Sequence, residues 1–263
     1  TVEPRTTLLE VFQNMENLGK LKMRIFGARD ISPACDIDEE IQILLDLKRQ
    51  YDDPLVKFTT AKFFLDGVVE GADAFLLEPY EPIPGASVPG KPPKYGLFLW
   101  KKEKLAEMFR RCMENDITIH CHSIGDGAVS NALDCIQSAV EKTGKWDHRT
   151  TLTHLQLVAE PDKARMADLK VIADVQPYWH FKSPSLFESV EKMLLGERAE
   201  SEYPLKSLMD QGVVVTASSD YPVTPEPNPF MGIQVACTRN LADAAAYGLA
   251  ELDNMDDLRY LLK

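Results

Sequence analysis

The sequence predicts an α/β fold built from parallel βα units, and three observations support this prediction. Short apolar or alternating segments repeatedly precede stretches with the three-to-four spacing of an amphipathic helix. Titratable residues gather near the carboxyl ends of four predicted strands, as they do in barrel enzymes. The sequence contains neither GxGxxG nor GxxxxGK[ST], the phosphate loops typical of open doubly wound sheets. We therefore predict a (β/α)8 barrel fold rather than an open sheet.

The first predicted helices and strands follow from the spacing of apolar residues and from residues that mark helix ends. Residues 7–18 predict a helix because their apolar residues recur at three-to-four spacing, and the strand 22–28 follows. A second helix, 39–50, comes after Asp36 and Asp38, which favour its amino end. The strand 61–67, the helix 100–115, the strand 116–122 and the helix 127–144 then repeat the same alternation.

The remaining elements continue this rhythm to residue 220. We predict strands at 149–156, 170–176 and 212–220, a helix after Pro161, and helices around 187–195 and 205–211. Two loops rich in Pro follow strands, at 76–93 and 221–229, and the first is long enough to predict an active-site lid. The whole chain, 1–263, is predicted to be a single catalytic domain.

Composition and charge exclude several classes of protein. The 263 residues include 41 acidic and 29 basic side chains, a net charge of −12 that would repel nucleic acid. No apolar run approaches the roughly 18 to 20 residues of a spanning helix, and the first residues do not resemble a signal peptide. Five cysteines without a CxxC pair are typical of reduced core thiols. We predict a cytoplasmic protein that binds neither nucleic acid nor membrane.

Three of the five histidines fall on predicted strands near their carboxyl ends. His120 and His122 lie two residues apart on one strand, so both face the same side, and His154 lies on the next strand. Neutral imidazole is the commonest metal ligand, and Asp220 adds a carboxylate at the end of another strand. A single strand histidine is more often a hydrogen-bonded core residue, but this combination favours a metal site.

Other chemistry is less well supported by the residues. Lys62 and Asp66 read most simply as an ion pair. Cys121 faces the side opposite to its neighbouring histidines, so neither of them can readily deprotonate it. Ser218 and Ser219 lack the GxSxG elbow of serine hydrolases. These residue types therefore do not predict a nucleophilic mechanism.

Five segments together resemble a known family. The segments AKFFLDGVVEG, IHCHSIGDGAV, RTTLTHLQ, VIADVQP and SSDYPV, in this order, are similar to the amidohydrolase superfamily. The similarity, which spans roughly residues 23–240, is to its YtcJ-like branch of metal-dependent amide hydrolases, which includes N-substituted formamide deformylases. HxIGD followed by Ala is specific for this branch, whereas SSD alone is not.

The resemblance implies a role for each matching residue. His122 and His154 match metal ligands, Asp220 matches the aspartate that binds metal and shuttles protons, and His154 and Asp220 are accordingly the predicted catalytic residues. Lys62 matches a lysine that such enzymes can carboxylate to bridge two metals. The resemblance further implies positions near the metal or the substrate for Asp126, Arg149, Gln156, His120 and Asp66.

The resemblance also implies an incomplete barrel. The family's first strand, with its HxH motif, and its flanking β-sandwich have no counterpart here, so the chain corresponds to about strands 3 to 8. The implied activity is that of the complete protein: hydrolysis of a non-peptide, amide-type carbon–nitrogen bond in a small molecule by water activated on one or two divalent ions, with zinc expected. The alternatives are a metal-dependent phosphoesterase and a metal-free scaffold, and a homo-oligomer is compatible with each.

Overall fold

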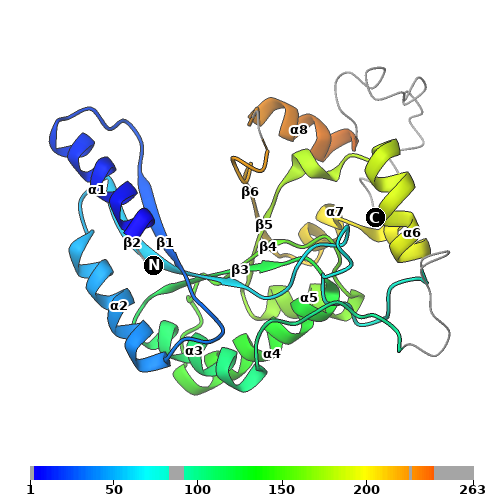
Figure 1. Ribbon diagram of the computed structural model, residues 1–263, viewed down its shortest axis with the longest axis horizontal. Coiled ribbons are helices and arrows are strands. Elements are labelled where there is room, and N and C mark those ends of the chain that lie inside the picture. The colour runs from blue at the N-terminus through cyan, green and yellow to red at the C-terminus, as the bar shows by residue number, and fades with distance from the viewer. Residues whose placement is uncertain (1–2, 83–91, 225–226, 240–263) are drawn as a thin grey trace. The chain divides into compact units, whose positions relative to one another are not determined.

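The computed structural model describes residues 3–82, 92–224 and 227–239 (Figure 1). It contains a six-stranded sheet in the order β1-β2-β3-β4-β5-β6. The strand bounds are β1 (Ile25–Asp30), β2 (Val56–Phe64), β3 (Thr118–Ser123), β4 (Thr151–His154), β5 (Ile172–Val175) and β6 (Val214–Ala217). β1 pairs in parallel with β2, β4 with β5, and β5 with β6. These pairings confirm the predicted α/β architecture of parallel strands.

The described residues divide into two compact units. Unit 1 comprises residues 3–64, 100–121 and 134–150, and unit 2 comprises 65–82, 92–99, 122–133, 151–224 and 227–239. β3 and α4 (Asp126–Thr143) supply residues to both units. The single catalytic domain over 1–263 stays a prediction.

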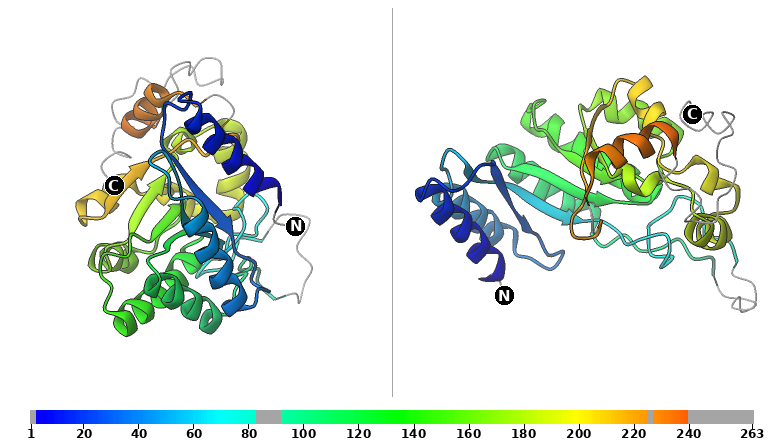
Figure 2. Two further views of the ribbon diagram at one scale, coloured as in Figure 1. Left: turned by 90° about the vertical axis from the view of Figure 1, so that its left-hand side faces the viewer. Right: turned by 90° about the horizontal axis from the view of Figure 1, so that it is seen from above.

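Unit 1 is organised around the strands β1 and β2. The helices α1 (Glu3–Asn17) and α2 (Ile37–Gln50) lie alongside this pair (Figures 1 and 2). The Asp36 side chain accepts from the Glu39 N–H at 3.0 Å and so caps α2, as the sequence signal predicts. Phe63 of β2 packs edge-on against Phe109 of α3 (Lys102–Glu114), with ring centroids 5.2 Å apart. Aromatic contacts of this kind hold α3 to the strand.

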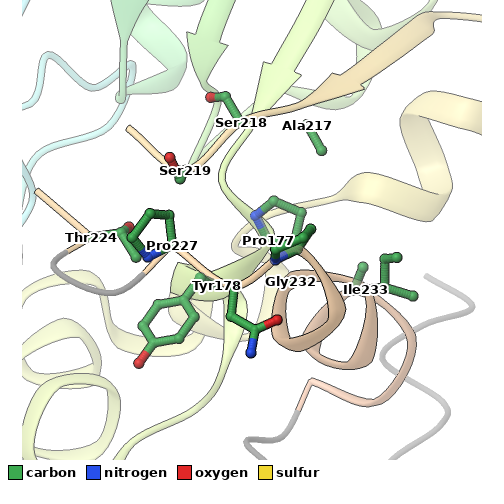
Figure 3. A pocket seen from close by; sticks show the side chains of 12 residues that line it. Pro177, Tyr178, Ala217, Ser218, Ser219, Thr224, Pro227, Gly232 and Ile233 are labelled. Atoms are coloured by element: carbon green, nitrogen blue, oxygen red, sulfur yellow. The ribbon is translucent and has the colours of Figure 1, made fainter. Parts of the chain in front are cut away.

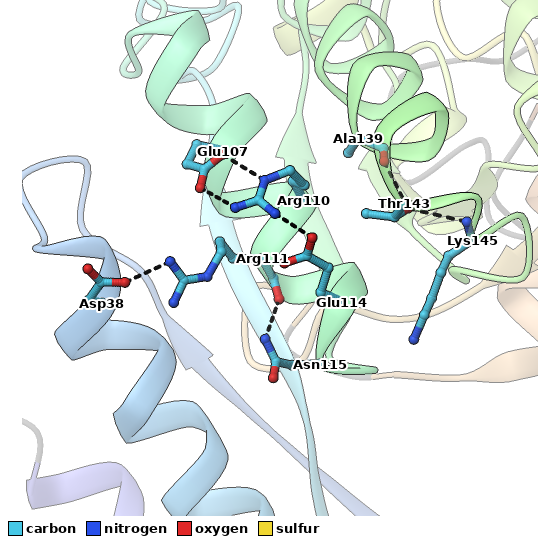
Figure 4. A network of polar contacts seen from close by, with 9 residues as sticks. All are labelled: Asp38, Glu107, Arg110, Arg111, Glu114, Asn115, Ala139, Thr143 and Lys145. Carbon is cyan, nitrogen blue, oxygen red and sulfur yellow. Dashed lines mark hydrogen bonds and ion pairs between the residues drawn. The ribbon is translucent and has the colours of Figure 1, made fainter.

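Charged side chains of α3 pair with one another and with Asp38 of α2 (Figure 4). Arg110 donates to Glu107 at 2.8 Å and also pairs with Glu114, one turn along the helix. Arg111 pairs with Asp38 at 2.6 Å and thereby links α3 to α2. Exposed pairs of this kind contribute at most about 1 kcal/mol each, so the buried apolar side chains of α3, Leu105, Met108, Phe109, Cys112 and Met113, contribute more to its packing.

Unit 2 contains the carboxyl ends of β3 to β6 and the segments that follow them. Its helices are α5 (Glu160–Asp168), α6 (Lys192–Leu195), α7 (Leu205–Asp210) and α8 (Pro229–Thr238). Short 3₁₀ helices cover Pro177–His180 and Gly196–Ser201, and a π-helical segment covers Pro184–Glu191. α8 packs on the Pro177–His180 turn (Figure 1). Residues after β2, after β3 and from the 184–201 segment share one apolar core.

Three elements differ from the sequence predictions. β2 begins at Val56 and ends at Phe64, because Val, Phe and Thr before residue 61 also favour a strand, so Asp66 follows the strand. The predicted helix 187–195 is a π-helical segment followed by the short α6. α8 was not predicted, although Asn228 caps it by accepting from the Phe230 N–H at 3.0 Å.

Parts of the two predicted loops lie outside the described residues. These parts are residues 83–91 of the first loop and 225–226 of the second. The described ends of the first loop are held together, since the Leu76 N–H donates to the Tyr95 carbonyl and the Tyr80 N–H to the Lys94 carbonyl, both at 2.8 Å. Every helix in the described ranges is too short or too polar to cross a bilayer.

Candidate metal centre

The two predicted histidine ligands on neighbouring strands lie side by side in unit 2. His122 is on β3 and His154 ends β4, and their side chains belong to residues only 9% and 5% exposed. Their ring centroids are 4.6 Å apart with an interplanar angle of 68°. The structure therefore brings together two imidazoles that are 32 positions apart in the sequence.

The hydrogen bond of His122 identifies its tautomer. Its Nε2 lies 3.0 Å from the carbonyl oxygen of Gly67, and it is 3.6 Å from Oδ1 of Asp66. A carbonyl oxygen only accepts hydrogen bonds, so Nε2 carries the proton. In the neutral ring the lone pair is then on Nδ1.

His154 is held at its ring edge and at its ring face. Its Nδ1 lies 2.7 Å from Oε1 of Gln176, and Trp179 stacks on the imidazole with centroids 5.1 Å apart and an interplanar angle of 8°. The Trp179 indole in turn donates from Nε1 to Oγ1 of Thr224 at 2.9 Å. These contacts fix the orientation of the His154 ring, which a metal ligand requires.

The backbone is left-handed at the strand ends that carry predicted ligands. His154 has φ +77° and the following Leu155 has φ +53°, and Asp220 after β6 has φ +52°. Non-glycine residues seldom adopt this region, and such conformations gather at functional sites. This observation favours a functional role for the ends of β4 and β6.

The buried carboxylate of Asp66 joins the segments that follow β2 and β3 through hydrogen bonds. It accepts from the backbone N–H groups of Phe75 at 3.0 Å, Ile124 at 3.1 Å and Gly125 at 2.8 Å. Burial raises the pKa of Asp66 to about 7, although the three N–H donors favour the ionised form. The carboxylate therefore connects the segment after β2 to the turn before α4.

Two further predicted site residues stabilise segments of unit 2. The Asp126 carboxylate accepts from the Leu77 and Gly127 N–H groups, both at 2.9 Å, and burial raises its pKa. Gln156 is buried, and its Nε2 donates to Glu202 at 2.7 Å and to Glu191 at 3.1 Å. Burial raises the pKa of Glu191 to about 7 and that of Glu202 to about 9.

The other three predicted site residues belong to unit 1. Lys62 is on β2 with its Nζ 5.1 Å from the centre of the Phe64 ring, and His120 is half-buried on β3. Arg149 is exposed just before β4, and its Nε lies 3.3 Å from Oδ1 of Asp147. The predicted roles of all three stay predictions.

Each of the two imidazoles has one unprotonated ring nitrogen, the form of histidine that binds a divalent ion. Their tautomers place lone pairs on Nδ1 of His122 and Nε2 of His154, as ligation requires. Asp220 is exposed, and across the described ranges no three His, Cys, Asp or Glu residues are grouped closely enough to hold a metal. The described residues therefore supply two candidate ligands, and the role of Asp220 stays a prediction.

A mainly apolar pocket of about 420 Å³ lies at the carboxyl ends of β5 and β6 (Figure 3). Pro177 and Tyr178 line it after β5, Ser218 and Ser219 after β6, and α8 contributes Ile233. Small-molecule sites are commonly pockets of this size with a few polar groups in an apolar wall. The pocket has the character expected of a substrate site.

Several residues around His154 are not identified by sequence patterns. Gln176 belongs to the quoted VIADVQP segment, yet no role was assigned to it, because its partner lies on another strand. Trp179 and Thr224 follow different strands and were also missed. A polar residue ending a predicted strand, followed by Pro, was the available signal for Gln176.

Comparisons with known proteins agree with these features. A family model described as "Amidohydrolase family" matches residues 6–258. YtcJ of Bacillus subtilis (strain 168), whose name assigns it to the amidohydrolases, is 31% identical over 186 residues, which are 71% of this chain and 32% of YtcJ. Protein LONG AFTER FAR-RED 3 of Arabidopsis thaliana is 31% identical over 200 residues, 74% of this chain and 32% of that protein.

A solved structure extends the comparison to the fold. An uncharacterized metal-dependent hydrolase from Pyrococcus furiosus superposes with a TM-score of 0.68 and 25% identity. The match covers 97% of this chain and 49% of that one. It confirms the predicted fold class, an incomplete barrel of the metal-dependent hydrolase type.

Proposed function

Because the chain belongs to the amidohydrolase family, as its motifs predict, we propose that the whole protein hydrolyses an amide-type, non-peptide carbon–nitrogen bond in a small molecule with the help of a divalent metal ion. The chain spans 32% of the length of each of the two curated relatives it matches. The activity is therefore proposed for the whole protein.

One observation supports this proposal above the others. His122 and His154 come from two strands, face each other with their rings 4.6 Å apart, and each uses one nitrogen as a hydrogen-bond donor. Each ring therefore has one unprotonated nitrogen, the form in which histidine binds a metal, while the hydrogen bond at the other nitrogen orients the ring. We assign His122 Nδ1 and His154 Nε2 to the metal.

A bound divalent ion supplies Lewis-acid activation of water and of the substrate carbonyl. Residues of the chain orient the substrate and transfer protons beside the ion. We assign Asp220 to accept a proton from water at its carboxylate and to return that proton to the leaving nitrogen. Asp220 has φ +52°, and left-handed conformations of non-glycine residues gather at functional sites in proteins.

The finer assignments follow the family pattern. We propose zinc as the ion, and Lys62, which would be carboxylated, as a further residue that would hold it where two ions bind. Arg149 and His120 are proposed to lie near the substrate or metal. The pocket lined by Tyr178, Ser218 and Ile233 is proposed to hold an apolar group of the substrate, because its walls are mainly apolar.

The proposal includes a cytoplasmic location and permits a homo-oligomer. The cysteines of the described residues are all free thiols, and Cys112, Cys121 and Cys135 are buried. The net charge of −12 disfavours nucleic acid as a partner.

The test is to purify the whole protein, measure its metals by elemental analysis, and assay N-formyl and N-acyl amines beside phosphate monoesters. We expect bound divalent metal and amide hydrolysis. His122→Asn and His154→Asn should lose metal and should slow hydrolysis by about 100-fold or more, because the ion contributes several kcal/mol to the transition state.

His148→Asn is the matched control. His148 is also a buried histidine, but its Nδ1 is bonded to Thr150 in unit 1. This variant should keep the parent metal content. Parent metal content and rate in both His122→Asn and His154→Asn would contradict the proposed ligands, and cleavage of phosphate esters alone would contradict the proposed bond.

A further inference from the structure

Gln176 and Asp174 belong to a polar network beside His154 to which the proposed mechanism assigns no role. Asp174 is on β5, and Gln176, only 1% exposed, is the first residue after this strand. Oε1 of Gln176 lies 2.7 Å from His154 Nδ1. Nε2 of Gln176 lies 2.9 to 3.2 Å from oxygens of Ser218, Thr153 and Asp174.

The carboxylate of Asp174 fixes the orientation of the Gln176 amide. Reversing the amide would place its oxygen against Oδ2 of Asp174 with no proton between them. Ser218 donates to that same Oδ2 at 2.9 Å, and Thr153 has two acceptors on Asp174, Oδ2 at 2.9 Å and the backbone carbonyl at 3.0 Å, so both hydroxyl oxygens can accept from Gln176. The Asp174 carboxylate, which only accepts, therefore requires the NH₂ group of Gln176 on its side, and both hydroxyls are compatible with that orientation.

This orientation determines which nitrogen of His154 carries its proton. Oε1 of Gln176 can only accept, so Nδ1 of His154 must donate, and the lone pair is on Nε2. We infer that Gln176, oriented by Asp174, is a positioning residue that fixes His154 in this tautomer. The claim that this tautomer serves metal binding rests on the proposed function. The claim that His154 adopts this tautomer does not.

The same network joins three strands of unit 2. Thr153 is on β4, Asp174 on β5, and Thr216 of β6 donates to Oδ1 of Asp174 at 3.1 Å. Ser218 also lines the apolar pocket. Gln176 thus links the His154 ring to the pocket wall. We expect a substitution of Gln176 to weaken metal binding more than it disturbs the packing of the apolar core.

The first measurement reads the tautomer in the unsubstituted chain, and a variant serves only to assign the His154 signals. Long-range ¹H–¹⁵N correlation spectra of ¹⁵N-histidine-labelled protein, recorded without metal, distinguish protonated from unprotonated ring nitrogens. The His154 signals are identified by their absence from the His154→Phe spectrum. We expect a protonated Nδ1 and an unprotonated Nε2; a protonated Nε2 with an unprotonated Nδ1 would overturn the inference.

The second measurement uses Gln176→Met, which keeps the side-chain volume and removes the acceptor oxygen. We expect the His154 ring to populate the other tautomer while the signals of the remaining histidines stay in place. Gln137→Met makes the same chemical change on the exposed face of α4 and should leave His154 unchanged. An unaltered His154 tautomer in folded Gln176→Met would overturn the inference.

Titration with Co²⁺ alone separates this inference from the proposed function. If both hold, the parent protein binds Co²⁺ and Gln176→Met weakens binding by roughly 10- to 100-fold, the usual effect of losing a partner of a ligating histidine. If the expected tautomer and its response to Gln176→Met are observed but the parent binds no Co²⁺, the inference stands and the proposed metal site fails. Equal Co²⁺ affinity in the parent and in folded Gln176→Met would overturn the positioning role.

Discussion

The carboxylate of Asp66 accepts hydrogen bonds from three backbone N–H groups. A substitution at Asp66 therefore tests how much these bonds stabilise the turn before α4. Asp66→Asn replaces one acceptor oxygen by an NH₂ group that faces N–H donors. Leaving buried donors without an acceptor costs about 1–3 kcal/mol. We expect the free energy of unfolding to fall by about that amount in urea denaturation.

The control for this substitution is Asp134→Asn. Asp134 makes an exposed ion pair with Lys102 at 2.6 Å, so its loss should change stability by less than about 1 kcal/mol. Similar losses in both variants would show that charge, rather than the buried hydrogen bonds, explains the effect of Asp66.

Single residues of the site were predictable where their type and strand position sufficed. The proximity of His122 and His154 could be predicted because alternation and strand order place them at one end of parallel strands, while their role as ligands stays a prediction. Gln176 could not be predicted, because its role depends on a partner 22 residues away and on the direction of its amide. Asp66 is predicted near the metal, but no pattern of residues indicates that the N–H groups of Phe75, Ile124 and Gly125 donate to its carboxylate.

At the scale of elements, the turn between β3 and α4 depends on Gly125. A Cβ at this position would lie 2.1 Å from the Phe75 carbonyl oxygen, a backbone atom that cannot rotate away. Gly125→Ala must therefore displace the segment that follows β2. Overpacking of this kind costs typically about 1–3 kcal/mol, and we expect a lower urea midpoint by a corresponding amount.

Gly232→Ala is the matched control for Gly125→Ala. No atom lies within 4 Å of the Cβ that this change would add, and Gly232 is inside α8. Ala is favoured over Gly in a helix by up to about 1 kcal/mol, so stability should stay constant or rise. A Gly125→Ala variant as stable as its parent would contradict the close packing of this turn.

All six strands could be predicted because each combines apolar or β-branched residues with a following turn signal. The segment 184–201 is harder to predict, because its π-helical and 3₁₀ geometry follows from tertiary contacts rather than from a regular spacing of apolar residues. α8 lacks a polar face over most of its length, so no amphipathic pattern marks it, and the Pro-rich sequence before it favoured a loop.

At the scale of the whole molecule, a buried pair of glutamates links stability to pH. Glu191 ends the π-helical segment and Glu202 follows the last 3₁₀ helix, and Gln156 donates to both. Desolvation is the largest cause of the raised pKa of each glutamate, and the partner carboxyl adds to it for Glu202, whereas Arg239 opposes it. Neither residue was recognised in the sequence, where both resemble ordinary surface glutamates.

The sign of the pH dependence follows from these raised pKa values. Unfolded glutamates lose their protons near pH 4.5, whereas the folded pair holds them to about pH 7 for Glu191 and about pH 9 for Glu202. Between these limits the folded state binds more protons than the unfolded state, so stability falls as pH rises. Each such proton contributes a slope of up to about 1.4 kcal/mol per pH unit.

Urea unfolding measured from pH 5 to pH 9 tests this linkage. Glu202→Gln removes the carboxyl group whose pKa is raised most and keeps the side-chain shape. We therefore expect the stability of this variant to decline less steeply over this range than that of the parent. Glu197→Gln changes an exposed glutamate in the same 3₁₀ helix and should follow the parent slope. If Glu202→Gln declines as steeply as the parent, the buried pair is not the origin of the pH dependence, because its proton would then make no difference between the folded and unfolded states.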